Sequence, residues 1–154
     1  MLGLPNYDLT DNGTKMANKH KEISKSLMEL WGDNTPHKAT DYLAPDYKNH
    51  QMPYVGGDTS VLSLQGWQEL VSEFHKGFSD VKMELLLQVT EGDYVCTRWR
   101  ITATHTGKFK QYKATGKTTS WTGVHTDRFK DGKMVESWVD WDKFTFMEKL
   151  GILN

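Results

Sequence analysis

The 154-residue chain is long enough for one domain with a buried core, and its 19 Lys and Arg residues nearly balance its 20 Asp and Glu residues. This balance disfavours nucleic acid and anionic membranes as partners, and no apolar run approaches the roughly 20 residues that span a bilayer. Because Cys96 is the only cysteine and the first residues do not resemble a secretory signal, we expect a soluble, cytoplasmic protein without an internal disulfide.

The N-terminal region predicts an arm followed by a helix. Residues 1–15 contain Gly, Asn, Asp and Pro without periodicity, so we expect an arm before a single domain of residues 16–154. Over residues 16–32, apolar side chains recur at helical spacing and a glycine ends the run. This pattern predicts an amphipathic helix with Trp31 on its buried face.

Two further helices flank a predicted loop. A Thr-Pro pair, typical of a helix start, opens a short predicted helix over residues 35–43. Residues 47–60 mix Pro, Gly, Asn and His, which indicates a loop with Asn49 and His50 at the mouth of a pocket. A third amphipathic helix is predicted over residues 63–78, where one face is apolar: Trp67, Leu70, Val71, Phe74 and Phe78.

Beyond residue 80 the apolar period changes to two, which predicts strands. Alternation over residues 81–89 and 95–105 predicts two strands joined by a turn, and His105 shares the parity of the apolar face. Residues 118–129 and 133–141 predict a final hairpin across an Asp-Gly turn, a pair suited to positive φ.

The order of these elements predicts an α+β fold. Helices come first, and an antiparallel sheet long enough to curl around them follows, which gives one concave core. A short helix over residues 143–150 closes the chain before Gly151. Asp142 directly precedes that helix and is expected to cap its first turn.

The final hairpin carries the polar residues of greatest chemical interest. Alternation places one set of side chains on a common face: Trp121, Gly123, His125 and Asp127 on the first strand, and Val135, Ser137, Val139 and Trp141 on the second. If this face meets the helices, His125 is buried beside aromatic residues. It is then either a hydrogen-bonded structural histidine or a group that transfers protons, and both interpretations stay open.

Other polar residues give weaker signals. Asp127 shares a face with His125, and such a pair would orient the imidazole, although side chains two positions apart on a strand need not touch. For His105, the burial statistics of histidine favour an exposed position at the rim. The sequence has no spacing typical of a metal site and no glycine-rich phosphate loop, so we expect neither a metal nor a cofactor.

Short motifs occur along the chain from residue 42 onward: YLAPDYKNH, FSDVKMEL, ATHTGKF, ATGK, HTDRFKDGKMVESWVDWD and EKLGIL. In these motifs the chain resembles the SnoaL-like polyketide cyclases, and the resemblance covers most of the chain from about residue 16. The resemblance implies the cone fold shared with nuclear transport factor two, in which helices pack in the hollow of a strongly curved sheet. It also implies a deep apolar pocket and, usually, a homodimer.

The resemblance further implies site residues. In characterised cyclases a pocket aspartate acts as acid and base in an intramolecular aldol closure, with a histidine nearby that matches His125. An aromatic residue on the first helix matches Trp31. The position of the aspartate falls on Val139, and the adjacent Asp140 would enter the pocket only if a bulge turned it inward.

Three functions remain open on this basis. The first is a small-molecule enzyme that uses His125 for proton abstraction or carbonyl polarisation on a hydrophobic, oxygenated substrate. The others are a noncatalytic binding module on the same fold and a cofactor-independent, hydroxylase-like relative. The expected ligand is a small hydrophobic molecule, in contact with this predicted set: Trp31, Asn49, His50, His105, Asp127, Val139 and Trp141.

The predicted homodimer would use the outer face of the sheet. Thr122, Val124 and Trp138 point away from the core by parity and form a partly apolar surface that a monomer would expose.

Overall fold

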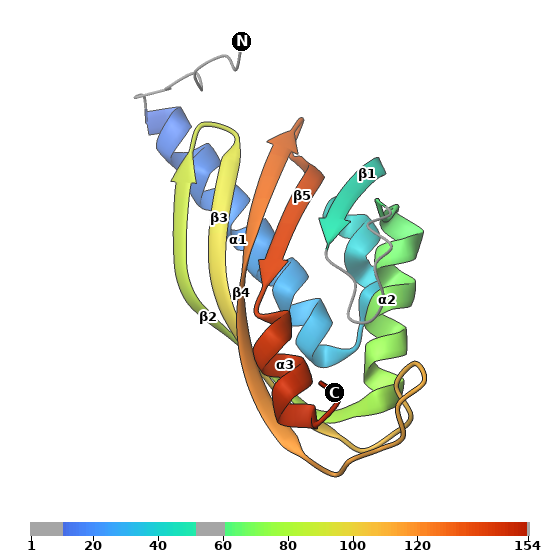
Figure 1. Cartoon of the computed structure of the whole chain (residues 1–154). Helices are drawn as coiled ribbons and strands as arrows, with labels where there is room; N and C mark the ends of the chain where they lie inside the picture. The colour runs from blue at the N-terminus through green and yellow to red at the C-terminus, as the bar shows by residue number, and fades with distance from the viewer. Residues whose placement is uncertain (1–10, 52–60, 154) are drawn as a thin grey trace.

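The computed structural model describes residues 11–51 and 61–153 of the chain, shown in Figure 1. In chain order the elements are α1 (Asp11–Asp33), the 3-10 helix η1 (Pro36–Asp41), β1 (Leu43–Gln51), α2 (Leu64–Gly77), β2 (Phe78–Glu91), β3 (Tyr94–His105), β4 (Thr118–Lys130), β5 (Lys133–Trp141) and α3 (Lys143–Leu150).

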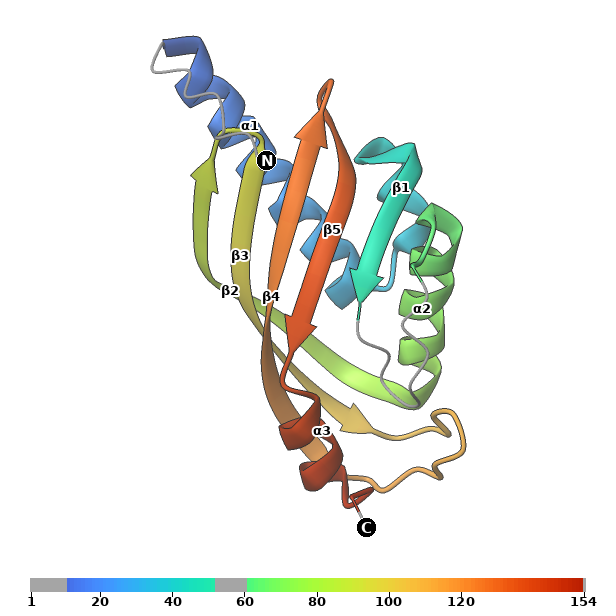
Figure 2. The same ribbon diagram turned by 45° about the horizontal axis from the view of Figure 1, so that its top comes forward.

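The five strands form one open, curved sheet in the order β1-β5-β4-β3-β2. Neighbours from β2 to β5 pair antiparallel, as predicted, whereas β1 pairs parallel with β5. Figures 1 and 2 show the sheet curling around α1, with α2 beside β1 and α3 beyond the end of β5. The α+β class and the curved sheet around N-terminal helices are confirmed, with the correction that the sheet is mixed.

Strand β1 occupies part of the segment that the sequence predicts as a loop. Its register shifts between Leu43 and Lys48, and Pro45 lies in that irregular stretch. A proline has no N–H to donate to a ladder and is therefore tolerated at an edge or a bulge. The loop prediction is wrong up to Gln51 because proline and polar residues conceal an edge strand, and its part over residues 52–60 lies outside the described residues.

Helix α1 begins several residues before the point at which its apolar periodicity starts. Residues 11–15 are helical, so the predicted arm is wrong for these positions, while residues 1–10 lie outside the described residues. The extra turn is exposed and polar, and for that reason it has no apolar stripe to reveal it. Asp11 lies in the first turn, where a carboxylate interacts favourably with the helix dipole.

The remaining helices follow their predicted signals. The short second helix is a 3-10 helix with Pro36 in its first turn, and it ends at Asp41, two residues before the predicted end. In α2 the Ser63 hydroxyl accepts a hydrogen bond from the Gly66 N–H at 3.2 Å. None of the described helices is both long and apolar enough to cross a membrane.

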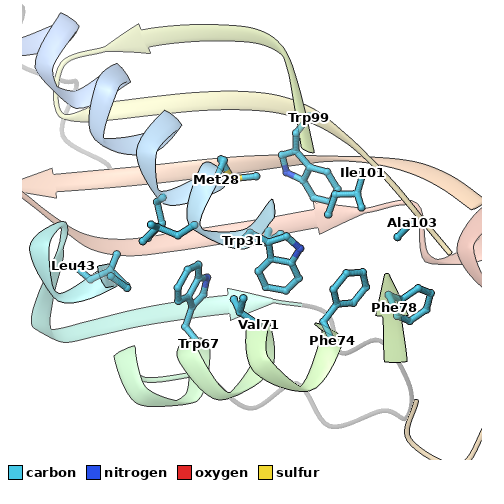
Figure 3. Packing of buried hydrophobic residues seen from close by; sticks show 14 of the residues in the cluster. Met28, Trp31, Leu43, Trp67, Val71, Phe74, Phe78, Trp99, Ile101 and Ala103 are labelled. Atoms are coloured by element: carbon cyan, nitrogen blue, oxygen red, sulfur yellow. The ribbon is translucent and has the colours of Figure 1, made fainter. Parts of the chain in front are cut away.

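The core fills the space between the helices and the concave face of the sheet. Figure 3 shows Trp31 of α1 against the α2 side chains, with Met28 and Trp99 on the side away from α2. Phe74 of α2 stacks on Phe78 with ring centroids 4.6 Å apart. These aromatic contacts fix the helices over the sheet and so determine where a cavity can form.

The final hairpin and the closing helix have their predicted ends. Asp131 and Gly132 adopt positive φ angles of 52° and 77°, as a two-residue Asp-Gly turn requires. Asp142 caps α3 by accepting from the Thr145 N–H at 2.9 Å, and Gly151 ends the helix in the left-handed region.

One irregularity changes which β5 residues point inward. The β4–β5 register shifts between Arg128 and Phe129, so that Met134 lies opposite Phe129 and is fully buried. Val135, which strict alternation predicts on the inner face, is only half-buried. A bulge adds one residue to one strand and thereby reverses the parity beyond it.

The outer face of the sheet carries the residues expected at a dimer interface. Thr122, Val124 and Trp138 are half-buried there. The homodimer stays a prediction.

Candidate active site

A narrow cavity lies between α1, α2 and the concave face of the sheet. Its lining is almost entirely apolar: Leu27, Met28, Trp31, Gln51, Trp67, Met83, Trp99, Ile101, His125, Val139 and Trp141. The cavity has a free volume of about 20 Å³, which is room for about one water molecule. A larger ligand must therefore displace lining side chains when it enters.

His125 is the one titratable side chain among these described lining residues. It lies on β4 and is 8% exposed. The Trp99 Nε1–H donates a hydrogen bond to His125 Nδ1 at 2.7 Å. The approach is close because Trp99 pairs with Gly123, whose missing side chain leaves room for the indole ring.

This hydrogen bond fixes the tautomer of His125. An indole N–H can only donate, so Nδ1 must be the acceptor and therefore carries no proton. Burial lowers the pKa of His125 to about 4, and the imidazole is neutral at pH 7. In the neutral ring the proton is then on Nε2. The side chain is a hydrogen-bond donor to the cavity, not a base.

We expect nuclear magnetic resonance to detect this tautomer directly. In a long-range proton–nitrogen spectrum at pH 7, His125 should show a protonated Nε2 and an unprotonated Nδ1. Trp99→Phe removes the donor and should give a mixture of both tautomers, because nothing then restricts Nδ1. Trp138→Phe, the same change on the outer face, should leave the His125 signals unchanged. A protonated Nδ1 in the unchanged protein would contradict the assignment.

The structure brings several predicted residues together. Trp31, Val139 and Trp141 line the cavity with His125, and Val139 lies directly opposite His125 in the β4–β5 register. Asp140 is exposed and pairs with Val124 in unbroken register. The condition for an inward Asp140 is not met, because the β4–β5 irregularity lies near the turn and not beside residue 140.

Asn49 and His50 point to opposite sides of β1, and neither is among the described lining residues. Asn49 is buried and donates to the Tyr47 hydroxyl at 2.9 Å. The His50 ring lies 2.8 Å from a Glu136 oxygen and stacks on Trp138. The sequence predicts both at a pocket mouth because it treats this strand as a loop, in which adjacent side chains have no fixed opposite directions.

His105 is buried, so the prediction of an exposed rim position is wrong. It is 1% exposed and stacks on Phe78 with ring centroids 4.9 Å apart. Its Nδ1 lies 3.2 Å from the Thr115 hydroxyl, and its backbone N–H donates to Lys117 O at 2.9 Å. Burial lowers its pKa. These contacts tie the end of β3 to the following loop and lie outside the cavity lining.

Asp127 is buried next to the cavity lining and belongs to a polar cluster. Its Oδ2 accepts from the Ser24 hydroxyl at 2.8 Å and its Oδ1 accepts from the Ser137 hydroxyl at 2.6 Å. Burial raises its pKa to about 6, while the two serine hydrogen bonds oppose that change. The hydrogen-bond partners of its carboxylate are Ser24 and Ser137 rather than His125, yet both Asp127 and His125 are buried on the inner face of β4.

Sequence reasoning missed the serines that hold Asp127 and the role of Trp99. Strand parity places Ser137 on the inner face, and a small polar residue at a buried position indicates that it has a buried hydrogen-bond partner. Ser24 lies 103 positions from Asp127 along the chain. No local pattern marks such a contact. Trp67 and Trp99 have the apolar periodicity of ordinary core residues, and only the fold places them at the cavity.

The comparisons with known proteins agree with this architecture. The sequence model of the SnoaL-like polyketide cyclases matches residues 21–150. AclR from Streptomyces galilaeus, a candidate hydroxylase, has a TM-score of 0.76 and 26% identity, with 90% of this chain and 88% of that chain covered. IdmH from Streptomyces antibioticus, a candidate polyketide cyclase, has a TM-score of 0.75 and 26% identity, with 86% and 98% covered.

More distant structures show the same fold. A candidate SnoaL-like polyketide cyclase from Jannaschia sp. CCS1 has a TM-score of 0.77 at 16% identity, with 97% of this chain and 100% of that chain covered. No curated protein matches the sequence. Because the family model spans most of the length, the chain belongs to the SnoaL-like polyketide cyclase family.

Proposed function

We propose that the protein is an enzyme that polarises a carbonyl group of a hydrophobic, oxygenated small molecule, with the Nε2–H of His125 as the hydrogen-bond donor. The observation that carries the proposal is the Trp99–His125 hydrogen bond at 2.7 Å. It leaves Nε2–H as the donor of a neutral ring in an apolar cavity, where a donor aimed at developing negative charge stabilises a transition state strongly.

The character of the cavity walls supports a hydrophobic ligand. Four tryptophans contribute to the lining, and their broad faces suit a flat or cyclic molecule: Trp31, Trp67, Trp99 and Trp141. Gln51 and His125 are the polar side chains among the described lining residues. A ligand with apolar rings and one or two oxygen atoms matches this combination.

A noncatalytic ligand-binding protein is the second candidate. It is favoured by Val139, which stands where the resemblance implies an acid/base aspartate, and by the lack of any carboxylate among the described lining residues. The similarity to AclR supports a third candidate, a hydroxylase-like reaction in the same cavity. Each of the three uses the same ligand class, so the test must follow the carbonyl group itself.

The test uses the bicyclic ketone 2-tetralone as the probe. Binding is followed by quenching of tryptophan fluorescence, and the carbonyl stretch of the bound ketone is followed by infrared difference spectroscopy. With the unchanged protein, we expect the stretch to move to lower frequency, because a hydrogen bond from Nε2 weakens the C=O bond. In His125→Ala the shift should disappear and affinity should fall about tenfold, the loss of about 1.4 kcal/mol expected for one hydrogen bond.

The matched control is His37→Ala, since His37 is exposed on η1 and is not among the described lining residues. It should bind 2-tetralone and shift the carbonyl stretch as the unchanged protein does. Failure of the unchanged protein to bind the ketone would contradict the proposed ligand class. Binding with an unshifted carbonyl, or an equal shift in His125→Ala, would favour the noncatalytic module.

A further inference from the structure

Polarisation of a carbonyl activates the adjacent C–H bond only if a base takes the proton. His125 is not that base, because its Nδ1 lone pair is occupied by the Trp99 N–H. Val139 and the other described lining residues offer no carboxylate, and Asp140 is exposed on the opposite face. The proposed function therefore requires an acid/base group that the lining itself does not contain.

Asp127 is the buried carboxylate on the same strand face as His125. Asp127 and Ser137 form the inward pair of the β4–β5 ladder that follows the pair His125 and Val139. Two residues along a strand span about 7 Å. Neighbouring inward positions therefore place the two side chains on one face, where a donor can reach a carbonyl oxygen and a base the carbon next to it.

Helix α1 connects the carboxylate to the cavity wall. Ser24, which donates to Asp127, lies one turn before Leu27 and Met28, and these two residues line the cavity. Since the cavity holds about one water molecule, a ligand must displace side chains of this wall. Asp127 is the next inward position after His125 along β4, so it is the nearest buried carboxylate on this strand face for a ligand that displaces this wall.

The hydrogen bonds around Asp127 hold its carboxylate in one orientation. Each oxygen accepts one serine hydroxyl, from Ser24 and from Ser137. The Tyr47 side chain of β1 also hydrogen-bonds to Ser137, and burial together with the nearby Asp127 raises the pKa of Tyr47, so the phenol stays neutral. A carboxylate oxygen has further lone pairs after one hydrogen bond, so both oxygens keep the capacity to accept a proton.

The charge state of Asp127 suits a base near neutral pH. Burial raises its pKa to about 6, and the ideal catalytic base has a pKa near the working pH. On α1, β1, β4 and β5 the buried titratable side chains besides Asp127 are Tyr47 of β1, His125 of β4 and His20 of α1, one turn before Ser24. Burial lowers the pKa of both histidines and raises that of Tyr47, so burial favours the neutral form of each of these three side chains.

We infer that Asp127 is the acid/base group of this cavity, with Ser24 and Ser137 as its positioning residues; the inference rests on the proposed function. The Asp127 carboxylate takes the proton from the carbon next to the ligand's carbonyl group. The electron pair of the broken C–H bond forms an enolate, whose oxygen accepts the hydrogen bond from His125 Nε2. The enolate carbon then attacks a second carbonyl of the same molecule, and the new alkoxide takes the proton back from Asp127.

The first experiment measures the proton step alone. In deuterated buffer, the protein should accelerate exchange of the 2-tetralone protons next to the carbonyl group, followed by proton magnetic resonance. Asp127→Asn keeps the shape of the side chain but cannot accept the proton. We expect it to reduce the protein-dependent exchange about 100-fold, while fluorescence quenching by the ketone persists.

The second experiment separates proton transfer from a purely structural role. Exchange by the unchanged protein should fall as pH decreases through about 6, where Asp127 is protonated. Ser24→Ala removes a hydrogen bond that favours the carboxylate, so the midpoint of this profile should move upward by about one pH unit. Ser120→Ala, the same change on the outer face of β4, should leave the midpoint unchanged.

The outcomes distinguish this inference from the proposed function. If Asp127→Asn binds the ketone and exchanges protons at the unchanged rate, the inference is wrong and the carbonyl polarisation by His125 stands. If Ser24→Ala lowers the rate without moving the midpoint, Asp127 does not hold the transferred proton and the inference is likewise overturned. If the unchanged protein binds the ketone without any exchange, both the proton step and the catalytic form of the proposed function are wrong.

Discussion

Replacing Gly123 with alanine is expected to lower the free energy of unfolding by about 3 kcal/mol and to abolish ketone binding in the cavity. A Cβ atom at this position would lie 2.3 Å from Trp99 Cζ2 and 2.8 Å from the Asp140 carbonyl oxygen. Overpacking of this kind typically costs about 1–3 kcal/mol. The displaced indole also loses its hydrogen bond to His125, which adds about 1 kcal/mol.

Urea denaturation measures the stability part of this prediction, with a lower midpoint at an unchanged slope. Gly66→Ala is the matched control, because a Cβ atom there would meet Leu62 at 3.4 Å, an ordinary contact. In a helix, alanine is favoured over glycine by up to about 1 kcal/mol, so this control should be neutral or stabilising. Equal stability of Gly123→Ala and the unchanged protein would show that Trp99 moves without cost and that the tautomer of His125 is not held by packing.

The parts of the fold that sequence reasoning predicted are those with a strong local pattern. α2 and the strands β3 and β4 have clear apolar periods, and the last turn has its Asp-Gly pair. The first turn of α1 is polar and β1 contains Pro45, so neither shows the apolar periodicity typical of a helix or a strand. The pairing of β1 with β5 buries Asn49, and no local signal distinguishes such a buried polar strand from a loop.

For the candidate site, the sequence predicts only which face of its strand each residue occupies. Alternation placed His125 on the inner face, and its burial follows. Its partner Trp99 is 26 positions away, and the contact depends on the β3–β4 register and on the space above Gly123. The distinction between a base and a donor depends on that one bond. Residue type and spacing therefore identify the histidine, whereas its chemistry requires the three-dimensional neighbours.

The unfolding free energy is also expected to depend on pH through Asp127. Its pKa is about 6 in the folded protein, against 3.8 for an aspartate in water, so the folded state binds the proton more tightly than the unfolded chain. Below about pH 4 both states are protonated. Between pH 4 and pH 6 the unfolded chain loses the proton first, and stability falls as pH rises. The full cost, about 2 pKa units at 1.36 kcal/mol each, is about 3 kcal/mol above pH 6.

The variant Asp127→Asn lacks this titration. Its free energy of unfolding minus that of the unchanged protein should therefore increase by about 3 kcal/mol between pH 4 and pH 7. His125 titrates in the same range with the opposite sign, because burial lowers its pKa to about 4, but it is present in both proteins and cancels in the difference. Urea denaturation of the pair at several pH values gives that difference directly. A difference that stays constant with pH would mean that the carboxylate ionises as easily inside the fold as in water. Asp127 would then lack the raised pKa that suits a base near neutral pH, although the serine hydrogen bonds would still hold it in place.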